Sequence, residues 1–194
     1  MAGDSYHHGD LRAACLRAAR ELLEEDGSAA LSLRAVARRA GVSPSAPYRH
    51  YADRDTLLAA VAASGYSELA ERLAAARPVP PSSPDDLVDG AVAYVRFALD
   101  HPALFRVMFA EPCDAKSEER TAAVAAISGS VTANVRRVFP AADPEAMSTA
   151  AWALVHGLAF LHLDGKLDSS TPEVLTANIR AVIHALFAAQ IPVC

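Results

Sequence analysis

The 194-residue sequence is poor in cysteine and glycine, and it has no long hydrophobic run. Its three cysteines, Cys15, Cys113 and Cys194, are odd in number, far apart and outside any metal-ligand spacing, so neither a disulfide framework nor a metal site is expected. No apolar run approaches the roughly 20 residues that cross a bilayer. Residues 1–10 lack the cationic and apolar stretches of a signal peptide. These absences predict a cytoplasmic protein with free thiols and no membrane partner.

Alanine is what the sequence has in excess, with 43 of the 194 residues. Hydrophobic residues make up 52% and charged residues 21% of the chain, which is enough apolar material for a buried core. Alanine is the best helix former, and strands favour β-branched and aromatic residues instead. The composition therefore predicts an all-α protein.

The charge of the chain is unevenly distributed. The net charge is −5, yet residues 28–54 carry a net charge of +4 because only Asp53 opposes the five arginines Arg34, Arg38, Arg39, Arg49 and Arg54. A local positive patch on an acidic chain favours a confined anionic partner, with nucleic acid as the first candidate. An ordinary solvated face is the alternative interpretation.

Hydrophobic periodicity, capping residues and prolines predict about nine helices. Their expected ranges are 11–26, 32–40, 43–51, 54–76, 85–100, 102–110, 115–138, 145–163 and 172–189. Four prolines in residues 77–84 cannot be helical, so this segment is predicted as a linker. The expected architecture is a three-helix N-terminal head that a long fourth helix joins to a C-terminal helical bundle.

The second and third predicted helices have the spacing of a helix-turn-helix. Ser32 caps the second helix, and Gly41-Val42-Ser43 forms a turn of suitable length before the third. Pro47 is the fourth residue of that third helix, where its missing N–H removes the first intrahelical hydrogen bond. We expect the helix to survive with a tight or 3₁₀-like first turn.

These residues carry a resemblance to a known family. The segments Leu31–Ser43, Pro47–Tyr51 and Asp53–Leu58 resemble the TetR family of bacterial transcriptional regulators, which has Ala-Gly-Val-Ser at the turn and Tyr-x-His-Phe after it. Tyr51 replaces the usual Phe, and Arg54 replaces a Lys. The sequence Trp152-Ala-Leu-Val-His-Gly157 is similar to a C-terminal type of the family named for its Trp…His-Gly signature.

The resemblance implies a DNA-binding domain at residues 9–69, with the helix-turn-helix at about 32–51, and a ligand-binding and dimerisation domain at residues 80–194. It implies a sequence-specific regulator that binds double-stranded, pseudo-palindromic operator DNA. Members of the family are mostly repressors, so a repressor that a small apolar ligand releases from the operator is expected. The protein would be cytoplasmic, and associated with the nucleoid when bound to DNA. The residues expected to contact DNA are Ser32, Arg34, Ser43, Ser45, Tyr48, His50 and Arg54.

A homodimer is expected, because one recognition helix buries too little surface for specific binding. The last two long helices are the predicted interface. Small residues would allow close approach of the two chains and larger ones would supply apolar area; they are Ala150, Ala151, Gly157, Ile179, Ile183, Leu186 and Phe187. Packing within one chain is the alternative for these positions.

Aromatic and polar residues at helical spacing form a second candidate site in the C-terminal region. A mostly apolar cavity with a few polar groups is typical of a small-molecule site. The predicted lining residues are Tyr94, Phe97, Phe105, Met108, Trp152 and His156, with ordinary core packing as the alternative.

No catalytic motif was found, so the chain is not expected to be an enzyme and no cofactor is expected. His156 and His162 are six residues apart, which places them in different directions on a helix and disfavours a shared metal ion. The alternative function is a helical small-molecule-binding or protein-interaction module without DNA binding. The sequence leaves open the ligand, the operator, the target genes and the choice between repression and activation.

Overall fold

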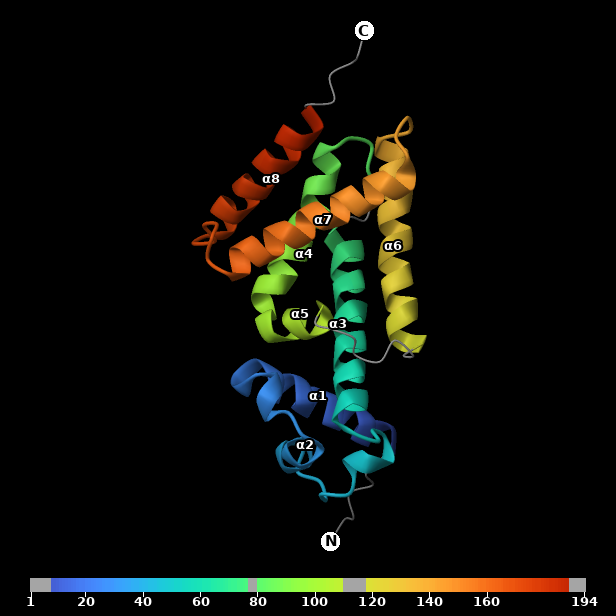
Figure 1. Cartoon of the computed structure of the whole chain (residues 1–194), viewed down its shortest axis with the longest axis vertical. Helices are drawn as coiled ribbons and strands as arrows, with labels where there is room; N and C mark the ends of the chain where they lie inside the picture. Colours follow the sequence, from blue (N-terminus) through green and yellow to red (C-terminus); the bar gives the residue numbers. More distant parts are fainter. Residues whose placement is uncertain (1–7, 77–79, 110–117, 189–194) are drawn as a thin grey trace. The chain divides into compact units, whose positions relative to one another are not determined.

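The computed structural model describes residues 8–76, 80–109 and 118–188 of the chain. Every regular element in these ranges is helical, which confirms the predicted all-α fold (Figure 1). There are eight α-helices and three short 3₁₀ turns. In chain order they are α1 (His8–Asp26), η1 (Ser28–Ala30), α2 (Leu33–Arg39), η2 (Pro47–Arg49), α3 (Arg54–Ala76), η3 (Asp85–Leu87), α4 (Val88–Asp100), α5 (Pro102–Phe109), α6 (Glu118–Val138), α7 (Pro144–Leu163) and α8 (Pro172–Ala188).

Capping residues set the ends of the first helices where the sequence predicts them. Gly27 and Gly41 follow α1 and α2 with φ of 78° and 67°, a left-handed conformation that favours glycine. Ser32 caps α2, and its hydroxyl oxygen accepts a hydrogen bond from the backbone N–H of Ala35 at 3.1 Å. The Asp53 carboxylate accepts one from the N–H of Thr56 at 2.7 Å in the first turn of α3.

The predicted third helix, residues 43–51, is not an α-helix in the structure. Only the 3₁₀ turn η2 is regular there, so the described part of the chain has eight α-helices and not nine. Pro47 has no N–H to donate to Ser43, whose carbonyl instead accepts from Ala46 at 2.9 Å in a tighter turn. The sequence predicted that the missing donor would affect only the first turn of this helix. In the structure, the whole short segment lacks α-helical hydrogen bonding.

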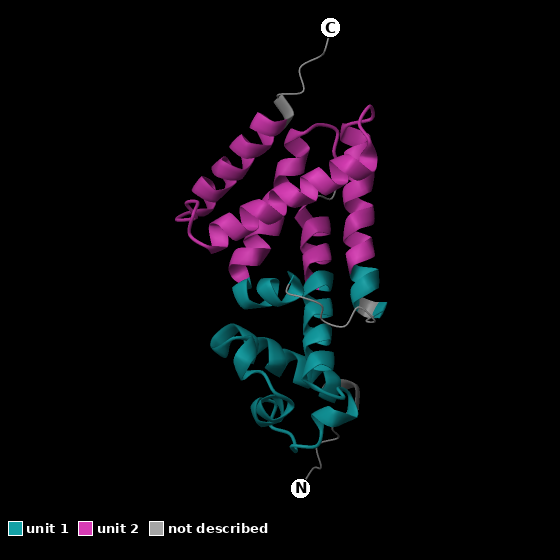
Figure 2. Cartoon of the chain, viewed as in Figure 1, with its two compact units in different colours: residues 1–67, 101–123 teal, residues 68–100, 124–194 magenta. Residues whose placement is uncertain are grey.

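The chain divides into two compact units, which Figure 2 shows in different colours. Unit 1 holds residues 1–67 and 101–123, and unit 2 holds residues 68–100 and 124–194. Residues 101–123, which include α5, group with unit 1, whereas the predicted C-terminal domain at 80–194 includes them and the predicted DNA-binding domain at 9–69 does not. The α3 helix is continuous across the boundary at residue 67.

Specific contacts hold α5 in unit 1. The Glu24 carboxylate of α1 accepts hydrogen bonds from the N–H groups of Ala103 and Leu104 at the start of α5, at 3.2 and 3.0 Å. The Tyr66 hydroxyl of α3 donates to the carbonyl of Met108 near its end, at 2.7 Å. Gly65 faces the side chains of α5 and leaves room for them. The short helix is thus fixed at both ends to the elements of the head.

Unit 2 is built on α4, which packs against α7 and α8. Val95, Phe97, Ala159 and Ile179 are fully buried among these helices. The Asp86 carboxylate accepts hydrogen bonds from Ser82 and Ser83 at the start of η3; the backbone N–H of Ser82 contributes most, and together they lower the pKa of Asp86 to about 2.

The α7 helix is exposed and apolar. It is long enough, and by composition apolar enough, to cross a membrane: the mean hydropathy of its best 18-residue window is 1.3, with 17% of that window buried within the chain. This finding concerns the average over a window that includes polar residues, whereas the prediction from the sequence concerned uninterrupted apolar runs. One such helix is weak evidence for a membrane span, because helices of soluble proteins pass the same test.

Two glycines within helices predict opposite effects of one substitution. A Cβ at Gly65 would lie 2.6 Å from Met108 Sδ and 3.1 Å from Leu104 Cδ1, whereas a Cβ at Gly129 would have no atom within 4 Å. Gly129→Ala should raise the free energy of unfolding by about 0.5–1 kcal/mol. Gly65→Ala should lower it by about 1 kcal/mol or more, since the buried neighbours must move. Urea denaturation of both variants checks this, and equal gains would contradict the close packing of α3 and α5.

Candidate functional site

The first candidate site is the surface of the head formed by α2 and the turn that follows it. The α2 helix ends in a Schellman-type turn, in which the N–H of Val42 donates to the carbonyl of Ala37 at 3.0 Å. Ser43 and Ser45 lie after this turn, and both are exposed, with their hydroxyl oxygens 3.4 Å apart. Tyr48, in η2, exposes 52% of its surface. A large aromatic side chain and several hydroxyl groups are therefore presented to solvent on one short segment.

The next residues connect this surface to the core. His50 is half-buried, and its ring packs edge-on against Tyr51 with the ring centroids 6.5 Å apart. Tyr51 is only 2% exposed, and its hydroxyl donates to the carbonyl of Arg12 in α1 at 3.3 Å. Tyr51 therefore anchors the segment that carries Tyr48 and His50.

Arg54, predicted as a phosphate contact, is engaged within the head. Its Nε and Nη2 atoms donate to the carbonyl oxygens of Leu31 and Ser28, at 3.0 and 2.6 Å. Its Nη1 atom lies 3.8 Å from a carboxylate oxygen of Asp55. The guanidinium thus joins the start of α3 to the chain that enters α2. These contacts give Arg54 a positioning role within the head. Its side chain is still 44% exposed, so its contact with DNA stays a prediction.

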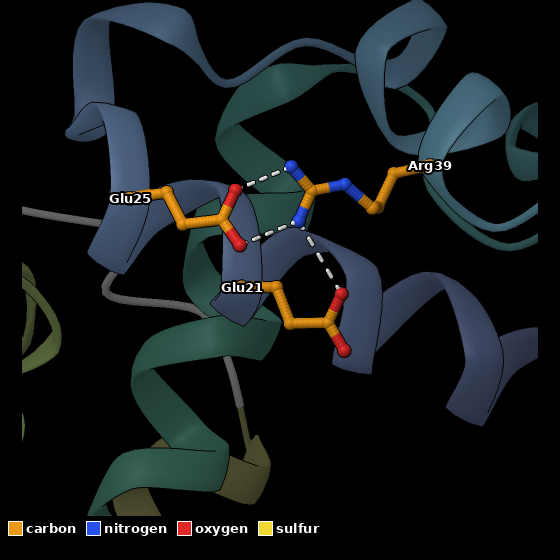
Figure 3. A network of polar contacts seen from close by, with 3 residues as sticks. All are labelled: Glu21, Glu25 and Arg39. Carbon is orange, nitrogen blue, oxygen red and sulfur yellow. Dashed lines mark hydrogen bonds and ion pairs between the residues drawn. The ribbon is translucent and has the colours of Figure 1, made fainter.

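Arg39 is engaged as well, as Figure 3 shows. Its guanidinium forms two hydrogen bonds to the Glu25 carboxylate of α1, at 3.0 and 2.5 Å, and a third to Glu21 at 3.4 Å. The bonds to Arg39 hold the pKa of Glu25 below its usual value. Two carboxylates therefore neutralise this arginine and tie α2 to α1.

Ser32 and Arg34, the remaining predicted contacts, are both exposed on α2. The Ser32 oxygen already caps the helix, which leaves its hydroxyl hydrogen free to donate elsewhere. Arg38 and Arg49 are exposed too, on α2 and η2. Both contribute to the positive charge of residues 28–54, but neither is among the predicted DNA contacts. Composition cannot separate a paired arginine from an unpaired one.

The second candidate site is an aromatic row on α7 in unit 2. The His156 Nδ1 atom is 3.0 Å from the Tyr94 hydroxyl of α4, within hydrogen-bond distance. The His156 ring also packs against those of Trp152 and Phe160, with centroids 5.8 and 4.9 Å away. Burial holds the pKa of His156 below its usual value, so the ring is neutral near pH 7. Trp152 exposes 51% of its surface at one end of this row.

Three other predicted ligand residues are fully buried. Phe97 lies in the core of unit 2, where the Arg72 guanidinium is 5.3 Å from its ring centroid. Phe105 and Met108 belong to unit 1, with Met108 packed against Gly65 and the Phe105 ring against Phe109. The structure therefore brings Tyr94, His156 and Trp152 together, but assigns these other three to the packing of the two units.

A hollow of about 320 Å³ opens on unit 2 between α4 and α8. None of the predicted ligand residues lines it. Its walls are formed by Arg96, Pro172, Glu173, Thr176, Ala177 and Arg180. In the described part of the chain, no group of three His, Cys, Asp or Glu side chains is arranged to hold a metal ion.

The residues predicted for the dimer interface fall into two groups. Ile179 and Ile183 are 0% and 2% exposed, so they belong to the core of unit 2 and have no surface to offer a second chain. Ala150, Gly157 and Leu186 are exposed, and a Cβ at Gly157 would meet no atom within 4 Å. Ala151 is half-buried. The side chain of Phe187 lies outside the described residues.

Comparison with known proteins identifies the class. Residues 16–61 match the model of the bacterial regulatory proteins of the tetR family, and residues 87–186 match a tetracyclin repressor-like C-terminal domain. HTH-type transcriptional regulators of Mycobacterium tuberculosis and Mycobacterium bovis are each 38% identical over 110 residues, which is 55% of this chain and 47% of the relative. The chain thus spans about half the length of the curated relatives it matches.

Solved structures agree over nearly the whole chain. A protein of unknown function from Rhodococcus sp. RHA1 is 34% identical with a TM-score of 0.78, over 94% of this chain and 98% of its own. A tetR-family regulatory protein from Rhodococcus RHA1 shares the fold at 22% identity, with a TM-score of 0.69 over 91% and 96% of the two chains. The architecture is that of a helix-turn-helix regulator with a helical C-terminal domain. The chain belongs to the tetR family of bacterial regulatory proteins. Members of such a family are usually not enzymes, and the Trp-His-Gly subtype stays a prediction.

Proposed function

We propose that the protein is a sequence-specific transcriptional regulator that binds a pseudo-palindromic operator in double-stranded DNA as a homodimer. The exposed segment with Ser43, Ser45 and Tyr48 is the single observation that carries the proposal. Exposed serines are ordinary on a turn, but the Tyr48 ring, at 52% exposure, contributes little packing to the head. The turn of a helix-turn-helix is where such groups reach base edges and phosphates.

The proposed division of work within the head follows from burial. Tyr48 and Ser45 would contact the DNA from the exposed segment, and Ser43 and Ser32 would donate hydrogen bonds to phosphate oxygens. His50, half-buried beside Tyr51, has its ring held in one place and would contact the backbone of the duplex. Arg54 would act indirectly, because its bonds to backbone carbonyls fix the approach of α2 to α3.

Substitution of the exposed head residues tests DNA binding. Selection from a random duplex library should first yield an operator with two related half-sites about 34–36 Å apart. Tyr48→Ala and His50→Ala should each weaken binding to it at least tenfold, since a good base or phosphate contact contributes about 1–3 kcal/mol and a homodimer loses two of them. Thermal unfolding should not change for Tyr48→Ala because that side chain is exposed, and Tyr48→Phe separates the hydroxyl from the ring. Selection that enriches no duplex would favour the alternative, a helical module without DNA binding.

We propose that a second copy of the chain covers the exposed faces of α7 and α8. Support comes from α7, which is apolar and mostly unburied within its own chain. Ala150, Gly157 and Leu186 are exposed, so small side chains on α7 would let two backbones approach closely while Leu186 supplies apolar area. Ile179 and Ile183 are left out of the proposed interface. This assembly would leave the protein cytoplasmic, with α7 buried against protein and not lipid.

Two glycines in open space provide a matched test of the interface. Gly157→Leu should shift the protein from dimer toward monomer, because a leucine side chain fills the space that a second backbone needs. Gly129→Leu, on α6, meets equally open space and should leave the mass unchanged. Light scattering at micromolar concentration measures the molar mass of both variants. A wild-type protein that is only monomeric there would refute the proposed dimer.

We further propose that a small apolar ligand releases the protein from its operator, which makes it a repressor. Trp152 and His156 support an aromatic ligand face, with Tyr94 and the neutral His156 ring as its polar groups. The continuous helix α3 supplies a mechanical connection, since 54–67 and 68–76 belong to different units. A ligand that tilts α3 would change the distance between the two heads, whose half-sites are fixed on DNA. Typical couplings of this kind are about 1–3 kcal/mol.

Trp152 should report ligand binding, because it is the only tryptophan and lies in the proposed ligand face. Titration with small apolar compounds should shift or quench its fluorescence, and the same compounds should lower operator affinity about 5- to 150-fold. His156→Phe, which keeps a ring but removes the polar atoms, should weaken both effects together. A compound that changes Trp152 emission without changing operator affinity would disprove the link between this face and release.

A further inference from the structure

The five arginines of residues 28–54 form two groups in the structure. Arg39 and Arg54 are engaged within the head, the first by Glu25 and Glu21 and the second by two backbone carbonyls. Two carboxylates therefore offset the charge of Arg39. The side chain of Arg54 is 44% exposed, but its N–H donors are directed to partners within the head. The local charge of +4 read from the sequence overstates what the head offers an anionic partner.

The other three arginines have no such partners. Arg34, Arg38 and Arg49 are exposed, and none forms an ion pair with any side chain in the described ranges. Arg34 and Arg38 are four residues apart on α2, where like charges repel and destabilise a helix slightly. Arg34 also lies in the first turn of α2, the end at which the helix dipole disfavours a cation. The helix dipole favours Arg38, which lies in the last turn of α2, but no described side chain pairs with Arg34, and an external anion would offset its charge.

We propose that Arg38 and Arg49, together with Arg34, are the side chains that neutralise DNA phosphates, and that Arg39 and Arg54 neutralise none. The inference rests on the proposed DNA-binding function and extends it. It adds two residues to the contact surface that the motif resemblance had not marked. It also removes Arg54, which stands where that resemblance places a cation for phosphate.

The proposal sets the salt dependence of DNA binding. Each phosphate that a cation neutralises contributes about −0.9 to the slope of log K against log salt. Three arginines in each of two heads give six phosphate contacts and a slope of about −5, whereas all five in each head would give about −9. The first value corresponds to roughly a thousandfold loss of affinity between 50 and 200 mM salt, and the second to more than a hundred thousandfold.

The experiment needs no knowledge of the operator, because non-specific binding depends on the same phosphate contacts. The probe is a 30-base-pair duplex of mixed sequence, titrated with the full chain by fluorescence anisotropy at several salt concentrations. Arg38→Gln and Arg49→Gln should each reduce the magnitude of the slope by about 2, since a homodimer loses two contacts. Because both side chains are exposed and unpaired, neither variant should unfold at a lower temperature than the wild type.

A charge-matched variant serves as the control. The double substitution R39Q with E25Q removes the internal pair without changing the net charge, so its slope should equal that of the wild type. A wild-type slope near −9, a reduced slope in this control, or an unchanged slope in Arg38→Gln and Arg49→Gln would overturn the assignment while leaving DNA binding itself intact. A wild-type protein that binds no duplex even at 50 mM salt would overturn the proposed function and this inference with it.

Discussion

The guanidinium of Arg54 provides the constraint on which the geometry of the head depends. It joins the first turn of α3 to the carbonyl groups of Ser28 and Leu31, the residues that lead into α2. The segment between α2 and α3 has little regular structure of its own, because Pro47 removes a backbone donor. The surface that presents Tyr48 is therefore held by contacts at its two ends, Tyr51 against α1 and Arg54 against the start of α2.

The charged residues of the head have two different roles: some form internal ion pairs, and others are exposed to solvent. An acidic chain must keep its carboxylates away from a polyanion, and here Glu21 and Glu25 face Arg39 while the exposed arginines face solvent. Ion pairs at this degree of exposure contribute little to stability. Their effect is to decide which cations remain available to a partner, and that property cannot be deduced from net charge.

The body of the molecule meets a different requirement. Unit 2 buries its larger apolar side chains in one core around α4, including Phe97 and Ile179, and leaves α7 with small residues such as Ala150 and Gly157 outward. A large exposed apolar surface on a soluble protein often marks an interaction site. In the proposed homodimer, a second copy of the chain would cover α7 and would bring the second head to the duplex.

The sequence by itself determined the all-α fold, the boundaries of most helices and the family, because alanine content, caps such as Ser32 and local spacing act over a few residues. It could not determine the fate of residues 43–51, since the cost of a missing donor at Pro47 depends on what else supports the segment. Only the tertiary structure showed that Arg54 is hydrogen-bonded within the head whereas Arg38 is exposed and unpaired. It likewise showed that Ile179 is buried whereas Leu186 is exposed. Each pair shares its chemistry, and the members differ in which distant residues the fold brings beside them.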